Sequence, residues 1–348
     1  SILNLIGLLL AIFSFAFIPP LVVTFIYKET LSEIFLYSFL FLISLGGLMW
    51  FISRQKGLPL NISDGFIITT MFWVVLAFAG SIPFYFFGLS INDAIFESVS
   101  GITTTGATLI VGLDDLPKSL LLYRQLLQWI GGMGLIILAV AVMPALGIGG
   151  SQLYKMELPG SHGNQKLTPK ITDSAKALWK IYFGLTLACA LLYILSGMDL
   201  FDAIAHSLST VAGGGFSTHD KSIGFFNSSL IEAVCIIFML LSAASFAVHY
   251  AAIFGGKPLR YFYDSEFRFF LSIVVSIVLV TSVFHTVSNS YTDILLTLRT
   301  SIFHTVSIVT TSGFTTENFS LWPSFLPYLL LVGAFMGACS QSVGGGIK

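Results

Sequence analysis

The sequence predicts an all-α membrane protein built from repeated units of helix, re-entrant segment and helix. Three observations support this fold class. Of the 348 residues, 55% are hydrophobic and only 9% are charged, against roughly 25% charged in an ordinary soluble domain. Eight charge-free runs reach or approach the roughly 20 apolar residues that a spanning helix needs. A short motif recurs three times between these runs, at a period of about one hundred residues.

The charge-free runs give the order of the predicted spanning segments. Each has an apolar centre, and a helix satisfies its own backbone hydrogen bonds in lipid. The first run lacks the basic start and the Ala-x-Ala cleavage site of a secretory signal, so we interpret it as a spanning helix. The eight runs cover residues 1–27, 34–53, 65–92, 125–154, 181–198, 233–256, 269–292 and 318–347.

The distribution of basic residues predicts the orientation. If the N-terminus is inside and all eight runs span, 11 of the 16 Lys and Arg residues lie inside, as the positive-inside rule requires. The stretches 88–118, 199–228 and 286–321 then lie outside. The inside residues are Arg54, Lys56, Lys155, Lys166, Lys170, Lys176, Lys180, Lys257, Arg260, Arg268 and Lys348.

Composition and motifs exclude several classes of protein. With a net charge of -1, the chain lacks the basic field that attracts nucleic acid. The cysteines Cys189, Cys235 and Cys339 lie in apolar runs without paired spacing, which argues against a disulfide framework or a zinc site. No nucleophile motif of the Gly-x-Ser-x-Gly kind lies beside a membrane histidine, and no HExxH pair occurs. We therefore expect that the chain is not an enzyme and that it carries no covalently bound cofactor.

The repeated motif aligns on one glycine in each copy. The copies read SVSGITTTGAT (98–108), SLSTVAGGGFS (207–217) and TVSIVTTSGFT (305–315). The glycines are 109 and 98 residues apart, and a serine stands six residues before each. All three copies fall on the predicted outer side. A simple turn motif that arose by chance would not recur at one period and on one side of the membrane. The aligned residues are Gly106, Gly215 and Gly313, and Ser100, Ser209 and Ser307.

A segment too short and too polar to span a bilayer leads into each motif. Residues 93–102 and 202–211 suit re-entrant half-helices, which we expect Asp93 and Asp202 to open as N-caps. Thr300 holds the matching place in the third copy. The C-terminal end of such a half-helix points partial negative charge toward the membrane centre, which favours a cation there.

Small residues follow each half-helix and end at the aligned glycine. Extended backbone at membrane depth is tolerated where it lines a wet cavity, and its carbonyls can replace the hydration shell of a monovalent cation. Glycine serves where the torsions exclude other residues. The sequence therefore predicts a cation filter made of Thr103, Thr104, Thr105, Gly106, Ala212, Gly213, Gly214, Gly215, Thr310, Thr311, Ser312 and Gly313.

Together these motifs resemble the Trk/Ktr/HKT superfamily of potassium transporters, and within it the bacterial Trk-type membrane subunit. The resemblance implies a potassium-channel-like fold, in which four helix, pore-loop and helix units surround a central pore. It implies two extra transmembrane helices in 1–60 and pore units in 61–155, 156–262 and 263–348. Only three pore loops are present, so we expect a fourth unit to be missing from this chain. The matching segments are TTTGAT (103–108), QWIGGMG (128–134), AGGGFSTHD (212–220), TTSGFTT (310–316) and GACSQSVGGGIK (337–348).

Two further glycine clusters have different interpretations. We interpret Gly131, Gly132 and Gly134 as packing residues that let one helix approach a pore helix. The cluster at the end of the chain interrupts the last run, and the resemblance implies an intramembrane gating loop beneath the filter. Close helix packing is the alternative. The predicted gating loop consists of Gly337, Ala338, Cys339, Ser340, Gln341, Ser342, Val343, Gly344, Gly345 and Gly346.

An ionisable residue stands nine positions before each filter glycine: Glu97, His206 and His304. Ionisable groups inside a membrane are functional hypotheses by default. We interpret these three as filter support, holding the pore loop from behind, while a role at the ion stays the alternative. Arg124 and Arg299 lie near the outer boundary, where they either snorkel, form pairs or repel cations at the pore mouth.

The predicted function is uptake of K⁺, the transported ion, through backbone carbonyls and without covalent chemistry. The alternative is a symporter that couples K⁺ to H⁺ or Na⁺. The sequence supports it less, because the three units share one orientation. The resemblance further implies a homodimer in the lipid of the bacterial inner membrane. It also implies a cytosolic nucleotide-binding regulatory subunit, for which residues 149–180 and 255–268 are candidate docking segments.

Overall fold

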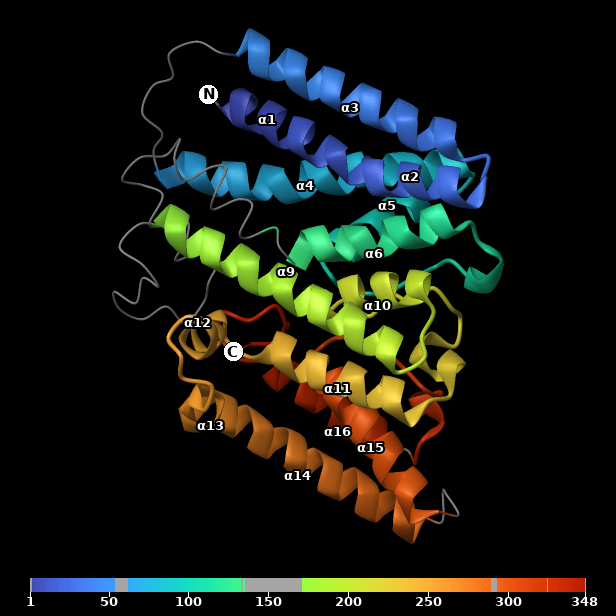
Figure 1. Ribbon diagram of the computed structural model, residues 1–348, viewed down its shortest axis with the longest axis vertical. Helices are drawn as coiled ribbons and strands as arrows, with labels where there is room; N and C mark the ends of the chain where they lie inside the picture. The colour runs from blue at the N-terminus through green and yellow to red at the C-terminus, as the bar shows by residue number, and fades with distance from the viewer. Residues whose placement is uncertain are drawn as a thin grey trace. The chain divides into compact units, whose positions relative to one another are not determined.

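All regular structure in the described part of the chain is helical. The computed structural model describes residues 2–53, 62–132, 134, 171–288, 293–323 and 325–347, and no strand occurs within these ranges. Five of the described helices are long and apolar enough to cross a membrane, and a bent helix pair would make a sixth span. The predicted all-α membrane fold is therefore confirmed (Figure 1).

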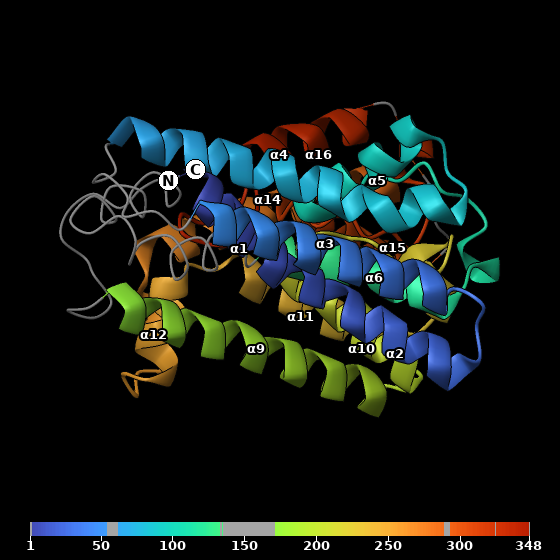
Figure 2. The same ribbon diagram turned by 90° about the horizontal axis from the view of Figure 1, so that it is seen from above.

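The chain divides into two units, of which the first contains the helices up to Gly132. The helix at the N-terminus lies beside the third one (Figures 1 and 2). A Cβ atom on Gly7 would lie 2.7 Å from the Gly46 carbonyl oxygen, so small residues bring these two backbones together. The helices are α1 (Ile2–Ser14), α2 (Ile18–Tyr27), α3 (Ser32–Ile52), α4 (Ile62–Phe87), α5 (Ile91–Ile102) and α6 (Lys118–Gly132), with 3₁₀ turns at Phe15–Phe17 and Leu113–Asp115.

The second unit contains the chain from Lys176 onward. Its central helix, α15, contacts α11, α14 and α16. The helices are α9 (Ile171–Leu195, whose first residues belong to the first unit), α10 (Leu200–Ala212), α11 (Ser229–Ala243), α12 (Phe246–Ile253), α13 (Arg260–Tyr263), α14 (Ser265–Val287), α15 (Ile294–Val309) and α16 (Phe325–Met336). The 3₁₀ turns are Ser222–Phe226 and Phe319–Leu321.

Two of the predicted spanning runs are not continuous helices. The run 233–256 is broken between α11 and α12, whose axes differ by 104°; Figure 1 shows α12 nearly end-on and α11 across the view. Among its described residues, the run 318–347 is α-helical only in α16, which ends before Gly337, where the chain turns with a φ of +67°. Most of a third run, 125–154, lies outside the described residues.

The half-helices begin earlier than expected, so the assignment of Asp93 and Asp202 as N-caps was wrong. The cap of α5 is Ser90, whose hydroxyl accepts from the Asp93 amide, and the cap of α10 is Asp199. In both helices the cap side chain accepts from the amide three residues later, at Asp93 (3.2 Å) and at Asp202 (3.0 Å), which adds the first turn. The third half-helix is one turn longer, since α15 is capped by Asp293.

Candidate functional site

The ends of the three half-helices share one backbone conformation. In each copy the carbonyl oxygen of the motif serine accepts a hydrogen bond from the amide five residues later, which folds the chain back at the helix end. The same local sequence thus produces the same turn three times. The donor and acceptor pairs are Thr105 and Ser100 (2.9 Å), Gly214 and Ser209 (3.0 Å), and Ser312 and Ser307 (2.9 Å).

Left-handed torsions occur at two positions of every copy, the aligned glycine and the residue two places before it. Threonine is strained there, because a β-branched residue with positive φ is an outlier. The earlier position belongs to the predicted filter in every copy, but its left-handed torsion was not expected; the one signal for it was Gly213 in the second copy. The φ values are +55° and +77° (Thr104, Gly106), +64° and +76° (Gly213, Gly215), and +61° and +83° (Thr311, Gly313).

The second and third copies lie against each other within the second unit. A Cβ atom on Gly215 would lie 1.9 Å from the Ser312 carbonyl oxygen, so the two backbones are in direct contact. The Gly224 amide also donates to the Thr315 carbonyl at 3.1 Å. The first copy belongs to the first unit and is described by itself.

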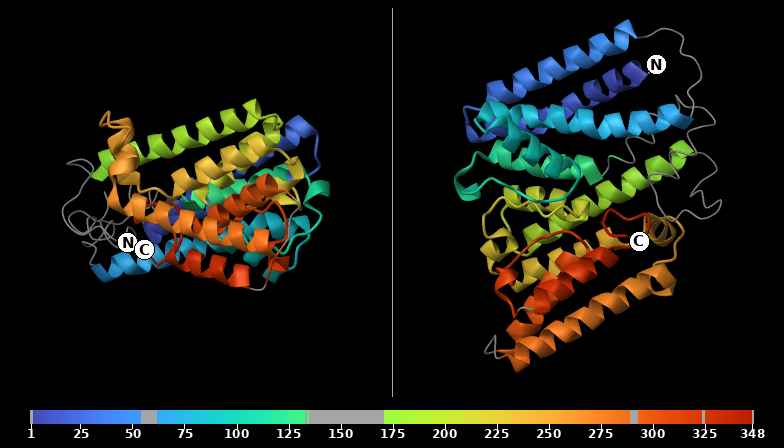
Figure 3. Two further views of the ribbon diagram at one scale, coloured as in Figure 1. Left: turned by 90° about the horizontal axis from the view of Figure 1, so that it is seen from below. Right: turned by 180° about the vertical axis from the view of Figure 1, so that it is seen from behind.

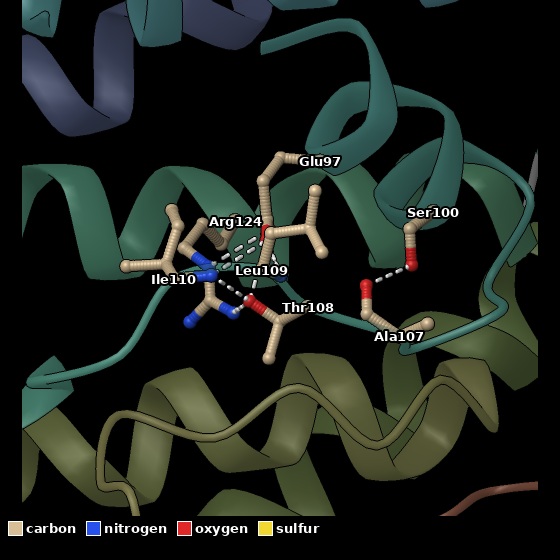
Figure 4. Close-up of polar contacts among 7 residues, drawn as sticks. All are labelled: Glu97, Ser100, Ala107, Thr108, Leu109, Ile110 and Arg124. Carbon is tan, nitrogen blue, oxygen red and sulfur yellow. Dashed lines mark hydrogen bonds and ion pairs between the residues drawn. The ribbon is translucent and has the colours of Figure 1, made fainter. Parts of the chain in front are cut away.

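Glu97 accepts hydrogen bonds from the segment that follows Gly106, the first of the aligned glycines (Figure 4). Its Oε1 accepts from the amides of Leu109 (2.7 Å) and Ile110 (3.3 Å) and from the Thr108 hydroxyl. The Arg124 guanidinium lies 3.5 Å from the other carboxylate oxygen and donates to Thr108 at 3.0 Å. Both charged side chains are fully buried. A buried charge is tolerated when it is paired and hydrogen-bonded in this way.

His206 and His304 make the corresponding bonds in the other two copies. The Nε2 atom of His206 lies 2.9 Å from the Ser217 hydroxyl, and its Nδ1 atom lies 2.9 Å from the Asp202 carbonyl. The Nε2 atom of His304 lies 3.3 Å from the Glu317 carbonyl. In each copy, the residue nine positions before the glycine therefore reaches the segment after it.

Two side-chain contacts complete the pore-loop geometry. The hydroxyls of Ser100 and Ser307 donate to the carbonyls of Ala107 (2.5 Å) and Phe314 (2.6 Å), one residue past each glycine; Figure 4 shows the first of these. The repeat aligns these serines but does not by itself predict their contacts.

The two arginines near the predicted outer boundary are both paired. Arg124 pairs with Glu97. Arg299 on α15 makes a bidentate pair with Glu232 on α11, at 2.6 and 2.7 Å. Of the three roles considered from the sequence, pairing is the one that the contacts support, since a guanidinium held by both carboxylate oxygens is fixed in place.

The glycine-rich segment after α16 folds back on itself. The Ala338 amide donates to the Gly345 carbonyl at 3.0 Å, and the Ile347 amide donates to the Phe335 carbonyl at 3.0 Å. A Cβ atom on Gly337 would lie 2.3 Å from the Gly345 carbonyl oxygen. Glycine is therefore required for the two arms of this segment to meet.

The same segment contacts three other elements. The Gly345 amide donates to the Thr311 hydroxyl at 2.7 Å, within the third copy of the motif. The Ser340 amide donates to the Glu266 carboxylate on α14 at 2.6 Å. Further backbone hydrogen bonds join the segment to residues at the break between α11 and α12. The view from behind shows this C-terminal segment reaching α12 (Figure 3). These contacts place residues 337–346 beside Thr311 in the third copy of the motif.

Gly131 is a packing residue, as predicted. A Cβ atom there would lie 1.9 Å from the Ile102 carbonyl oxygen, at the C-terminal end of α5. α6 thus lies directly on the end of the first half-helix, and the absent side chain allows this approach.

We expect Gly131→Ala to lower stability because the added methyl group overlaps Ile102. Overpacking of this kind costs typically about 1–3 kcal/mol. The measurement is the thermal midpoint of the purified protein in detergent. Gly47→Ala is the matched control, because no atom of the described residues lies within 4 Å of its added Cβ. Equal midpoints for the two variants would show that α6 does not depend on this approach.

Comparisons with known proteins show the family to which the chain belongs. Residues 31–348 match the family model described as TrkH, cation transport protein. The chain is 49% identical to the Trk system potassium uptake protein TrkH of Vibrio parahaemolyticus (serotype O3:K6), over 100% of this chain and 73% of that protein. It is 45% identical to the protein of the same name from Escherichia coli K12, with the same shares covered.

A solved structure is also similar over the whole chain. The crystal structure of the potassium transporter TrkH from Vibrio parahaemolyticus has a TM-score of 0.88 and 47% sequence identity, and covers 100% of this chain and 72% of its own. These relatives are transporters, in agreement with the expectation that the chain is not an enzyme. From its sequence motifs, its helical fold and these matches, the chain belongs to the TrkH family of cation transport proteins.

Proposed function

We propose that this chain takes up K⁺ across the bacterial cytoplasmic membrane and that segments 103–106, 212–215 and 310–313 line its selectivity filter. The observation that carries the proposal is the pair of left-handed torsions in every copy. A left-handed non-glycine residue costs of order 1–3 kcal/mol, and such strain concentrates at functional sites. A filter that must present carbonyl oxygens to a dehydrated cation supplies a reason for it.

The polar groups behind the filter suit a supporting role. The bonds of Glu97, His206 and His304 go to the segments that follow the glycines. Groups engaged in this way hold the pore loop in shape and leave cation binding to the backbone. The C-terminal end of each half-helix adds partial negative charge beside its own copy of the motif.

Residues 337–346 are proposed as the gate. They lie beside Thr311 through the Gly345 amide, and the segment is not helical. A short stretch held by a few backbone bonds opens at lower free energy than a packed helix. A cytosolic nucleotide-binding subunit that docks on residues 255–268 is proposed to act on this gate. The chain is proposed to form a homodimer. Of the other candidate docking segment, residues 149–170 lie outside the described residues.

Ion flux tests the proposal. Full-length protein in liposomes is expected to take up K⁺ when the interior is made negative, with no dependence on a pH or Na⁺ gradient. Uptake that follows an imposed H⁺ or Na⁺ gradient at zero potential would instead establish the symporter.

The proposed orientation, with the N-terminus inside, predicts which positions react with an impermeant thiol reagent. Cysteine at Lys221 is expected to react from outside and cysteine at Lys257 only from inside, because both residues are exposed and lie on opposite sides by the basic-residue bias. The native cysteines are buried and give a low background. The measurement is labelling of intact cells against opened ones. Labelling of position 257 in intact cells would contradict the orientation.

A further inference from the structure

The local sequence supplies one feature at the break between α11 and α12: Ser245 caps α12, and its hydroxyl accepts from the Ala247 amide at 3.3 Å. Sharp kinks are almost always found at proline, at Gly/Ser pairs, at a π-bulge or at an inserted group. Neither glycine nor proline occurs from Ser229 to Phe254. Residues 241–249 read LSAASFAVH, and the alanines among them favour helix. The serine cap permits α12 to begin at this point, and the 104° bend further depends on tertiary contacts.

The glycine-rich segment supplies these contacts. A broken helix leaves amides and carbonyls without partners, which is expensive at membrane depth. Three backbone bonds from the segment satisfy such groups on both sides of the break. They join the Cys339 amide to the Ala243 carbonyl (3.0 Å), the Val343 amide to the Ser242 carbonyl (3.2 Å), and the Phe246 amide to the Gln341 carbonyl (2.9 Å).

The same groups would satisfy one another in a straight helix. There the Phe246 amide would donate to the Ser242 carbonyl, four residues earlier. The Ala247 amide, now bonded to the Ser245 hydroxyl at 3.3 Å, would donate to the Ala243 carbonyl. If α11 and α12 form one continuous helix when the glycine-rich segment departs, these amides and carbonyls all keep a hydrogen-bond partner.

His249 holds the bent form. Its Nε2 atom lies 3.0 Å from the Leu241 carbonyl, which only accepts, so Nε2 carries the proton and Nδ1 accepts from the Tyr261 hydroxyl at 2.7 Å. Partial burial raises the pKa of Tyr261, so the hydroxyl remains a donor. In a straight helix eight residues span about 12 Å, so the bond from His249 to Leu241 exists only when the helix is bent.

We propose that His249, held by Tyr261 of the cytosolic segment α13, is a positioning residue that keeps α11–α12 bent and thereby keeps the glycine-rich segment docked beside the filter. The proposal rests on the proposed function, in which the docked segment obstructs the pore. A partner that moves α13 away from α12 releases His249, and α11–α12 straightens as the segment leaves. The link from the cytosolic surface to the pore is thus one chain of hydrogen bonds.

Tyr261→Phe is the sharpest test, because it removes one hydroxyl and keeps the ring that packs 6.0 Å from Phe267. The helix form is measured as the distance between spin labels on cysteines placed at the exposed positions Ile237 and Ile253. Sixteen residues span about 24 Å in a straight helix and less in the bent one. We expect the long distance to gain about fivefold in population, the effect of one lost hydrogen bond, and K⁺ flux to rise with an unchanged K⁺ to Na⁺ ratio.

Tyr263→Phe is the control, since Tyr263 is exposed on the same short helix; it should leave both readouts unchanged. His249→Ala should reproduce the shift to the long distance. Unchanged distances in Tyr261→Phe and His249→Ala would refute the proposal that His249 and Tyr261 hold α11–α12 bent. A distance shift without a rise in K⁺ flux would refute the link between the bend and conduction. Absence of K⁺ flux from the unmodified protein would refute the proposed function, while the distances would still decide whether His249 holds the bend.

Discussion

Replacement of Gly215 by serine is expected to destroy K⁺ selectivity while the chain still folds. The added Cβ atom would lie 1.9 Å from the Ser312 carbonyl oxygen, on a residue with a φ of +76°. The left-handed torsion alone costs of order 1 kcal/mol for a residue with a side chain, and the overlap forces the second and third copies apart. The K⁺ to Na⁺ flux ratio should fall at least about tenfold, since a tenfold change corresponds to only about 1.4 kcal/mol.

Gly313→Ser separates the two contributions. Its φ is +83°, but among the described residues nothing lies within 4 Å of its added Cβ atom. The torsional strain in this variant is similar to that in Gly215→Ser, but the overlap with a neighbouring backbone is absent. We therefore expect a smaller loss of K⁺ selectivity. Flux ratios in liposomes provide the measurement for both variants. If Gly215→Ser kept the ratio of the unmodified protein, the filter assignment would have to be abandoned.

Gly337→Ala is expected to raise the conducting fraction about tenfold without changing which ion is selected. Gly337 has a φ of +67°, and its Cβ atom would meet the Gly345 carbonyl oxygen at 2.3 Å, so the folded-back segment cannot close. Strain of about 1–3 kcal/mol in the docked form shifts the equilibrium toward release. The filter glycines are untouched. Single-channel recording gives the open fraction and the permeability ratio together.

The control for this variant is Gly256→Ala, which has a φ of +61° but open surroundings in the loop before α13. It tests whether left-handed strain alone alters conduction. A loss of selectivity in Gly337→Ala at unchanged K⁺ flux would place residues 337–346 in the ion-coordinating structure rather than in a gate.

Local chemistry explains why much of this protein was predictable. Composition and charge-free runs are sufficient for the membrane class, because only helices or closed barrels satisfy a backbone in lipid. The three pore turns were predictable because each depends on a short stretch ending at a glycine, as the matched bonds of Ser100, Ser209 and Ser307 demonstrate. The true caps were within reach as well, since Ser90 and Asp199 stand three residues before an acidic residue.

Contacts between distant segments were beyond the reach of the sequence. The pairing of Glu97 with Arg124 joins α5 to α6, and the left-handed torsion of Thr104 contradicts the preference of its own residue type. The α11–α12 segment, between Ser229 and Ile253, is the clearest case: its sequence favours one continuous helix. Hydrogen bonds from residues more than ninety positions away break it, because in lipid each backbone group takes whichever partner the tertiary structure offers.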